Sequence, residues 1–78
     1  MIGINPTDQF DTNLQVCYEI LLYLSSRVAR LQPGEVLEFT SGDPDSGERI
    51  AAWCDMRGYT LLESVPVDDG RTRFLIQK

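Results

Sequence analysis

Residues 16–31 read VCYEILLYLSSRVARL, and the predicted fold is built around this stretch. Its apolar side chains at positions 17, 20, 21, 24, 28 and 31 recur every three or four residues, which is the spacing of one face of an α-helix. We therefore predict a helix over residues 16–31 with this face toward a core. The side chains expected to face water are Glu19, Ser26, Arg27 and Arg30.

The residues on either side mark the ends of this helix. Asp11, Thr12 and Asn13 each carry a side chain that can accept a hydrogen bond from a free N–H group, and we expect one of them to begin the helix. Pro33-Gly34 ends it, because proline cannot continue a helix and glycine suits the turn that follows.

Cys17 falls in or just before the first turn of this helix. Unpaired N–H groups and the positive end of the helix dipole lie there, and both favour the thiolate, which is the reactive form of cysteine. Glu19, two residues after Cys17, opposes a second negative charge. The structural interpretation is that Cys17 is a small apolar residue of the inner stripe, and the residues alone favour that interpretation.

The remaining elements are read from apolar runs and from turn residues. An extended segment is expected over residues 8–13 with Phe10 pointing inward, and a strand over residues 35–41. Pro44 suits the first helical position after an Asp43 cap, and a second helix follows over residues 46–57. Gly58 lies at the position of its C-terminal cap.

The last third of the chain predicts a hairpin. A strand over residues 59–67 contains Pro66, which indicates an edge position or a bulge. Asp69-Gly70 fits a tight turn, and residues 72–77 alternate as a final strand. The order is βαβαββ, which predicts an α+β fold: a two-layer α/β sandwich with two helices on one face of a four-stranded mixed sheet. We expect residues 1–78 to form a single domain, with residues 1–7 as a loosely held lead-in.

Composition excludes several classes of function. The chain has no histidine, which excludes His-dependent triads and His-dependent metal sites. Its 12 acidic and 7 basic residues give a formal net charge of −5, which opposes binding to nucleic acid. No apolar run is long enough to cross a bilayer, and two cysteines without a C-x-x-C pair indicate free thiols in a reducing compartment. We expect a cytoplasmic protein that makes no contact with membrane or nucleic acid and needs no metal.

The chain resembles the TusA/SirA family of small sulfur-carrier proteins over nearly its whole length. The resemblance lies in the order and spacing of short motifs. These motifs are Asp11, Cys17, Gln32-Pro33-Gly34-Glu35, Asp43-Pro44, Trp53-Cys54, Gly58 with Leu61-Leu62-Glu63, and the closing Arg73-Phe74-Leu75-Ile76-Gln77-Lys78.

The resemblance implies a sulfurtransferase-type persulfide carrier without a cofactor. Cys17 corresponds to the family's acceptor cysteine, which takes sulfane sulfur from a donor such as a cysteine desulfurase and passes it to an acceptor protein. Family members supply tRNA thiolation and related sulfur trafficking. We expect the protein to be a monomer whose partners are this donor and this acceptor.

The sequence departs from the family at the cysteine motif. The family motif C-P-x-P is here Cys17-Tyr18-Glu19-Ile20, so both prolines are absent, and Leu14 stands where a glycine is usual. The alternative is therefore a non-catalytic protein-interaction or regulatory module of the same fold. An exposed Cys17 favours the carrier, and a buried Cys17 favours the module.

Two further residues are assigned to the core. Cys54 shares a helical stripe with Ile50, Ala51 and Trp53, so we predict a buried thiol with no role in catalysis. Trp53 is expected to anchor the core or its edge.

Overall fold

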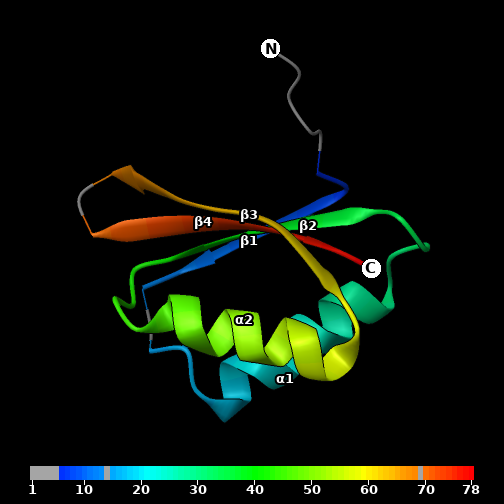
Figure 1. Cartoon of the computed structure of the whole chain (residues 1–78), viewed down its shortest axis with the longest axis horizontal. Helices are drawn as coiled ribbons and strands as arrows, with labels where there is room; N and C mark the ends of the chain where they lie inside the picture. Colours follow the sequence, from blue (N-terminus) through cyan, green and yellow to red (C-terminus); the bar gives the residue numbers. More distant parts are fainter. Residues whose placement is uncertain (1–5, 14, 69) are drawn as a thin grey trace.

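The computed structural model describes residues 6–13, 15–68 and 70–78, and it has two layers. A four-stranded sheet forms one layer, and both helices pack on one of its faces (Figure 1). The elements in chain order are β1 (Asp8–Thr12), α1 (Tyr18–Ala29), β2 (Val36–Ser41), α2 (Ser46–Arg57), β3 (Thr60–Asp68) and β4 (Arg71–Gln77). The predicted α+β sandwich and its βαβαββ order are confirmed.

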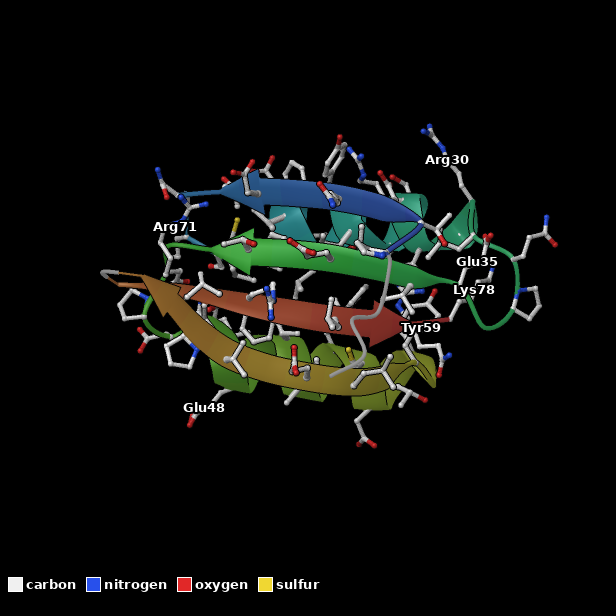
Figure 2. The ribbon with its side chains drawn as sticks, turned by 90° about the horizontal axis from the view of Figure 1, so that it is seen from above. Arg30, Glu35, Glu48, Tyr59, Arg71 and Lys78 are labelled. Atoms are coloured by element: carbon white, nitrogen blue, oxygen red, sulfur yellow. The ribbon has the colours of Figure 1, made fainter. Side chains whose placement is uncertain are left out.

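The strands lie side by side in the order β1-β2-β4-β3. Figure 2 shows this order from the uncovered face, with both helices behind the sheet. β1 pairs parallel to β2, with Phe10 opposite Phe39, whereas β4 runs antiparallel to both of its neighbours. The sheet is mixed because α1 returns the chain so that β2 lies parallel to β1, while the consecutive strands β3 and β4 pair antiparallel.

β3 forms one edge of the sheet, and its pairing with β4 is irregular. The register shifts between Leu61 and Glu63 and again between Pro66 and Asp68. Proline has no N–H to give to a strand ladder, so it is tolerated at an edge or a bulge. Pro66 predicted an edge position or a bulge, and both are confirmed: β3 is an edge strand, and its register shifts next to Pro66.

Aromatic rings form the centre of the core between sheet and helices. Phe39 and Phe74 are fully buried on the neighbouring strands β2 and β4, with ring centroids 6.1 Å apart. Phe10 of β1 stacks on the other side of Phe39 at 5.7 Å. From α1, Leu24 and Val28 are fully buried against these rings. The stripe that predicted the helix is thus the one that packs on the sheet.

Helix α1 is shorter than predicted at both ends. It begins at Tyr18 with Cys17 as the N-cap, and it ends at Ala29. The expectation that Asp11, Thr12 or Asn13 begins the helix is wrong, because β1 includes the first two and all three lie at least four residues before Cys17. Asp11 and Thr12 instead pair with Thr40 and Ser41 at the end of β2. Their backbone is therefore part of the sheet and does not lead directly into the helix.

The prediction that Arg27 faces water is wrong, because its guanidinium binds side chains of β1 and α1. Its Nε and NH2 donate to the two carboxylate oxygens of Asp8 at 2.9 and 2.8 Å, and its NH1 donates to the Tyr23 hydroxyl. The guanidinium also lies 5.4 Å from the centre of the Phe10 ring. The hydrogen bond from Arg27 lowers the pKa of Asp8. These contacts fasten α1 to the edge strand β1.

Lys78 binds carbonyl groups at the C-terminal end of α1. The Lys78 ammonium donates to the carbonyl groups of Ala29 and Leu31 at 2.9 and 2.8 Å, where the negative end of the helix dipole lies. Its backbone N–H donates to Glu35, and Figure 2 shows Lys78 and Glu35 together at one end of the sheet. Lys78 therefore stabilises the turn that follows α1.

Some predictions fall wholly or partly outside the described residues. These are the lead-in over residues 1–7, of which 1–5 are not described, the substitution at Leu14, and the first residue of the Asp69-Gly70 turn. Gly70 has a φ of 79°, which suits a tight turn that needs a left-handed residue.

Leu24→Ala should lower the free energy of unfolding by about 2–5 kcal/mol, because it leaves a cavity under the aromatic core. Leu22→Ala, on the same helix but 45% exposed, is the matched control and should cost less than about 1 kcal/mol. Urea denaturation followed by tryptophan fluorescence measures both. Equal losses in the two variants would contradict the assigned packing of α1.

Candidate functional site

Cys17 lies at the solvent-exposed start of α1. Its backbone is extended, with φ −110° and ψ −175°, and its carbonyl accepts the first helical hydrogen bond, from Leu21 at 3.0 Å. The side chain makes no capping hydrogen bond, and the thiol is free and exposed. The interpretation of Cys17 as part of the buried stripe is therefore wrong.

The surroundings of this thiol suit a reactive sulfur. The N–H groups of the first helical turn have no acceptor within the helix, and the helix dipole favours negative charge at this end. The first turn is helical from Tyr18 onward, so tyrosine and isoleucine at positions 18 and 20 allow the helix to begin where the family motif has prolines. A thiol in this place has access to a second sulfur atom without movement of the fold.

Val16, one residue earlier, anchors the cysteine to the rest of the molecule. Its side chain is fully buried in the core. Its N–H donates to Asp43 Oδ2 at 2.8 Å, and its carbonyl accepts from Arg49 NH1 at 2.8 Å. Both backbone polar groups of Val16 are thus bound by charged side chains, one just before α2 and one in its first turn.

Asp43 has a different role from the predicted helix cap. The N-cap of α2 is Asp45, and Pro44 precedes the helix rather than opening it. The Asp43 carboxylate is buried and accepts hydrogen bonds from the N–H groups of Val16 and Asp45. These two bonds, followed by the charge of Arg49, lower the pKa of this carboxyl. Asp43 is therefore ionised at neutral pH and joins the cysteine segment to α2.

Cys54, unlike Cys17, is buried. It is 2% exposed inside α2, and burial raises the pKa of its thiol to about 11. The neighbouring Trp53 is also buried, and its indole N–H donates to Ser25 Oγ at 3.1 Å. The prediction that both residues belong to the core is confirmed.

An apolar groove between the two helices begins beside Cys17. Its volume is about 370 Å³, and the residues that line it are Tyr18, Leu21, Leu22, Ser25, Trp53, Met56 and Arg57. Tyr18 and Met56 are 74% and 77% exposed, which is unusual for apolar side chains of this size. The core stripe of residues 16–31 does not predict this groove. The signal was present, because Tyr18 and Leu22 are one turn apart and form a second apolar stripe beside the core stripe.

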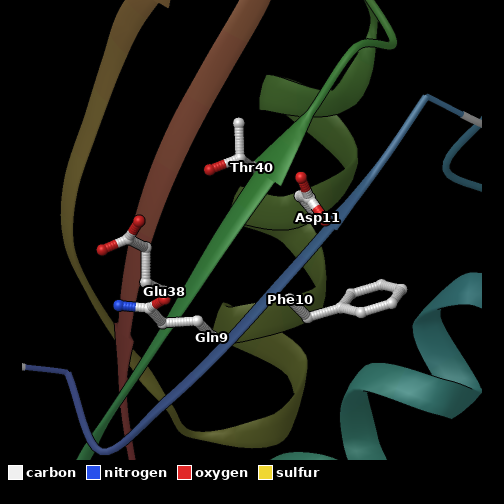
Figure 3. Close-up of a pocket in the computed structure, with 5 residues that line it drawn as sticks. All are labelled: Gln9, Phe10, Asp11, Glu38 and Thr40. Carbon is white, nitrogen blue, oxygen red and sulfur yellow. The ribbon is translucent and has the colours of Figure 1, made fainter.

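A smaller hollow of about 250 Å³ lies across β1 and β2, on the uncovered face of the sheet (Figure 3). The side chains of Gln9 and Glu38 lie together on that face, whereas the ring of Phe10 points toward α1. Asp11 and Thr40 complete the lining, and neither cysteine contributes to it. This hollow is separated from Cys17 by the sheet.

The described residues contain neither a metal-binding cluster nor a helix that could span a membrane. Within residues 6–13, 15–68 and 70–78, no group of three or more His, Cys, Asp or Glu side chains is placed to hold a metal ion. Neither of the described helices is long and apolar enough to cross a membrane.

The fold and the site define a small α+β protein with one exposed thiol at the start of a helix and one thiol buried in the core. The family model described as Sulfurtransferase TusA matches residues 9–78. The chain therefore belongs to the TusA sulfurtransferase family, as the sequence motifs indicated, and it has a general role as a sulfur carrier that works with sulfur-transfer partners. A search of curated proteins found no match.

Iodoacetamide at mildly alkaline pH should modify Cys17 and spare Cys54, because alkylation needs an accessible thiolate. Peptide mass spectrometry after a short exposure measures the occupancy of each cysteine. In urea both should react, which controls for the intrinsic reactivity of the two peptides. Modification of Cys54 at the rate of Cys17 in the folded protein would contradict the assigned burial.

The free energy of unfolding should fall as the pH drops below about 4. Because the pKa of Asp43 is lowered in the folded protein, the unfolded chain takes up a proton first, near the ordinary aspartate value of about 3.9. Above that value the carboxylate is charged in both states, and its contribution to stability is complete.

Asp43→Asn isolates this contribution. The amide offers one acceptor to two N–H donors, so stability at neutral pH should fall by about 1–3 kcal/mol and the loss on acidification should be smaller than in the wild type. Asp55→Asn, which removes an exposed carboxylate on α2, should leave the acid dependence as it is in the wild type. Identical acid dependence in wild type and Asp43→Asn would contradict this assignment.

Proposed function

We propose that Cys17 is the sulfur-carrying residue of this protein. One observation supports this most strongly: in a member of a sulfurtransferase family, Cys17 is exposed at the start of a helix and Cys54 is buried. A carrier needs a single accessible thiolate that can attack another sulfur and later be attacked itself. Of the two thiols in the chain, only Cys17 meets this need.

The proposed reaction is a thiol–persulfide exchange that needs no cofactor. The Cys17 thiolate attacks the outer sulfur of a donor persulfide, R–S–S–H. A new S–S bond forms on Cys17 and the donor S–S bond breaks, so that R–S⁻ leaves and Cys17–S–S–H remains. The second step is the same exchange in reverse, with an acceptor thiolate attacking the outer sulfur on Cys17. Charge and electrons balance in each step, so no external oxidant or reductant takes part.

The proposed partners follow from the two steps. The donor is a cysteine desulfurase or a similar protein that bears a persulfide. The acceptor is a protein that supplies tRNA thiolation or a related pathway of sulfur trafficking. We propose that the protein acts in the cytoplasm, because a reducing compartment keeps Cys17 in its thiol form. We also propose that it acts as a monomer without a bound metal or organic cofactor.

The alternative function is a protein-interaction or regulatory module that no longer transfers sulfur. Two observations favour it: both prolines of the family motif are absent, and an exposed apolar groove begins at Tyr18. A groove of this kind suits contact with another protein. It is compatible with both functions, so the chemistry of Cys17 distinguishes them.

Incubation with a cysteine desulfurase and cysteine should add one sulfur atom to the peptide that contains Cys17. Intact and peptide mass spectrometry measures the gain, with inorganic polysulfide as a second donor that needs no protein docking. Cys17→Ser should show no gain, and Cys54→Ala should behave as the wild type.

The outcomes separate the two functions. Sulfur on Cys17 from either donor supports the carrier. Sulfur on Cys54 alone, or no sulfur from either donor on a folded protein, would contradict the carrier and leave the interaction module.

A further inference from the structure

The segment that leads into Cys17 is held at two points. Near its start, the carbonyl of Thr12 accepts from Gly42 N–H at 3.0 Å. A side chain at Gly42 would place its first carbon 2.7 Å from Asn13 Oδ1, so the two segments meet closely there. At its end, Val16 is held by Asp43 and Arg49. The cysteine segment is thus fastened to the chain that runs from the end of β2 into α2.

Both backbone polar groups of the buried Val16 are paired with charged side chains. Buried backbone groups are nearly always hydrogen-bonded, and here the N–H donates to a carboxylate and the carbonyl accepts from a guanidinium. Hydrogen bonds to ionised partners are stronger than those between neutral groups. The buried side chain of Val16 adds a third contact, so neither rotation nor displacement of this peptide is free.

The partners of Val16 are themselves fixed. Asp43 receives a second hydrogen bond from Asp45 N–H, and its own N–H donates to the buried Ser41 Oγ. Arg49 lies in the first turn of α2. Because Asp43 lies in the connection between β2 and α2 and Arg49 lies in α2 itself, the position of Val16 is set by contacts outside its own loop.

We propose that Asp43 and Arg49 are positioning residues for sulfur transfer, which hold the backbone of Val16 so that the Cys17 thiol points in one direction. This inference rests on the proposed function of Cys17. In the family motif, prolines after the cysteine restrict the backbone at this point. Here Tyr18 and Ile20 replace them, and the restraint comes from the residue before the cysteine.

The chemical reason is that exchange between two sulfur atoms needs a defined approach. The attacking sulfur must reach the outer sulfur of a persulfide that is itself held on another protein, so both partners must be placed correctly. Loss of orientation by about 1 Å can lower such a rate by about a hundredfold. A small reagent in solution adapts to any direction of the thiol and does not depend on the restraint.

Arg49→Met tests this inference directly. The rate of sulfur transfer from a persulfidated cysteine desulfurase to Cys17 should fall on the order of tenfold to a hundredfold. The rate of alkylation by iodoacetamide should change by less than about threefold, because that reaction needs exposure and not direction. Arg49→Lys, which keeps a positive donor, should recover part of the transfer rate.

Two further variants serve as controls. Arg30→Met removes an exposed arginine near the other end of α1 and should transfer sulfur at the wild-type rate. Arg49→Leu, which also removes the donor to the Val16 carbonyl, is the second test variant, with the same expected loss, if Arg49→Met does not fold. Thermal unfolding of each variant shows whether a change in rate follows a change in the folded fraction.

Transfer at the wild-type rate in folded Arg49→Met or Arg49→Leu would overturn the positioning role and leave Cys17 as the carrier. Equal losses in transfer and alkylation would also overturn it, since they would indicate a structural role alone. If wild-type protein takes up no sulfur on Cys17, the proposed function fails and this inference fails with it.

Discussion

The attachment of Val16 is the constraint that connects the fold to the site. Its side chain is part of the core, and its peptide groups are bound by Asp43 and Arg49. Because Val16 precedes the N-cap residue by one position, these contacts decide where α1 begins and therefore where Cys17 is presented. A second set of contacts, around Gly42, joins the end of β1 to the chain that leads into α2.

The two cysteines differ in burial, and this difference separates an accessible thiol from an inaccessible one. Cys54 lies among apolar side chains, where burial raises the pKa of its thiol to about 11 and excludes reagents. Cys17 has the same chemistry but lies outside the packed layers, at the end of a helix where negative charge is favoured. A protein that carries sulfur on one thiol benefits from a second thiol that cannot intercept it.

Local patterns predicted the elements, whereas contacts between distant residues decided the details. The apolar stripe of residues 16–31 predicted α1, and Pro66 predicted an irregular edge strand, because both signals lie within a few neighbouring residues. The roles of Asp43, Arg27 and Arg49 depend on partners 19 to 33 residues away, and no periodicity encodes such contacts. Capping propensity alone could not predict Asp43, since a carboxylate before a helix also suits a turn. The exposure of Cys17 likewise depends on where packing starts the helix, and the stripe alone suggested burial.

We propose that Cys17 both accepts sulfur and gives it away. A pulse–chase measurement tests both steps. The protein is loaded with radiolabelled sulfur from cysteine through a desulfurase, separated from the donor, and mixed with an excess of an unlabelled acceptor thiol. We predict that one labelled sulfur per chain is bound at Cys17 and then passes to the acceptor, which leaves the protein ready for a second cycle. Absence of label at Cys17, or label that stays on the protein through the chase, would contradict a carrier.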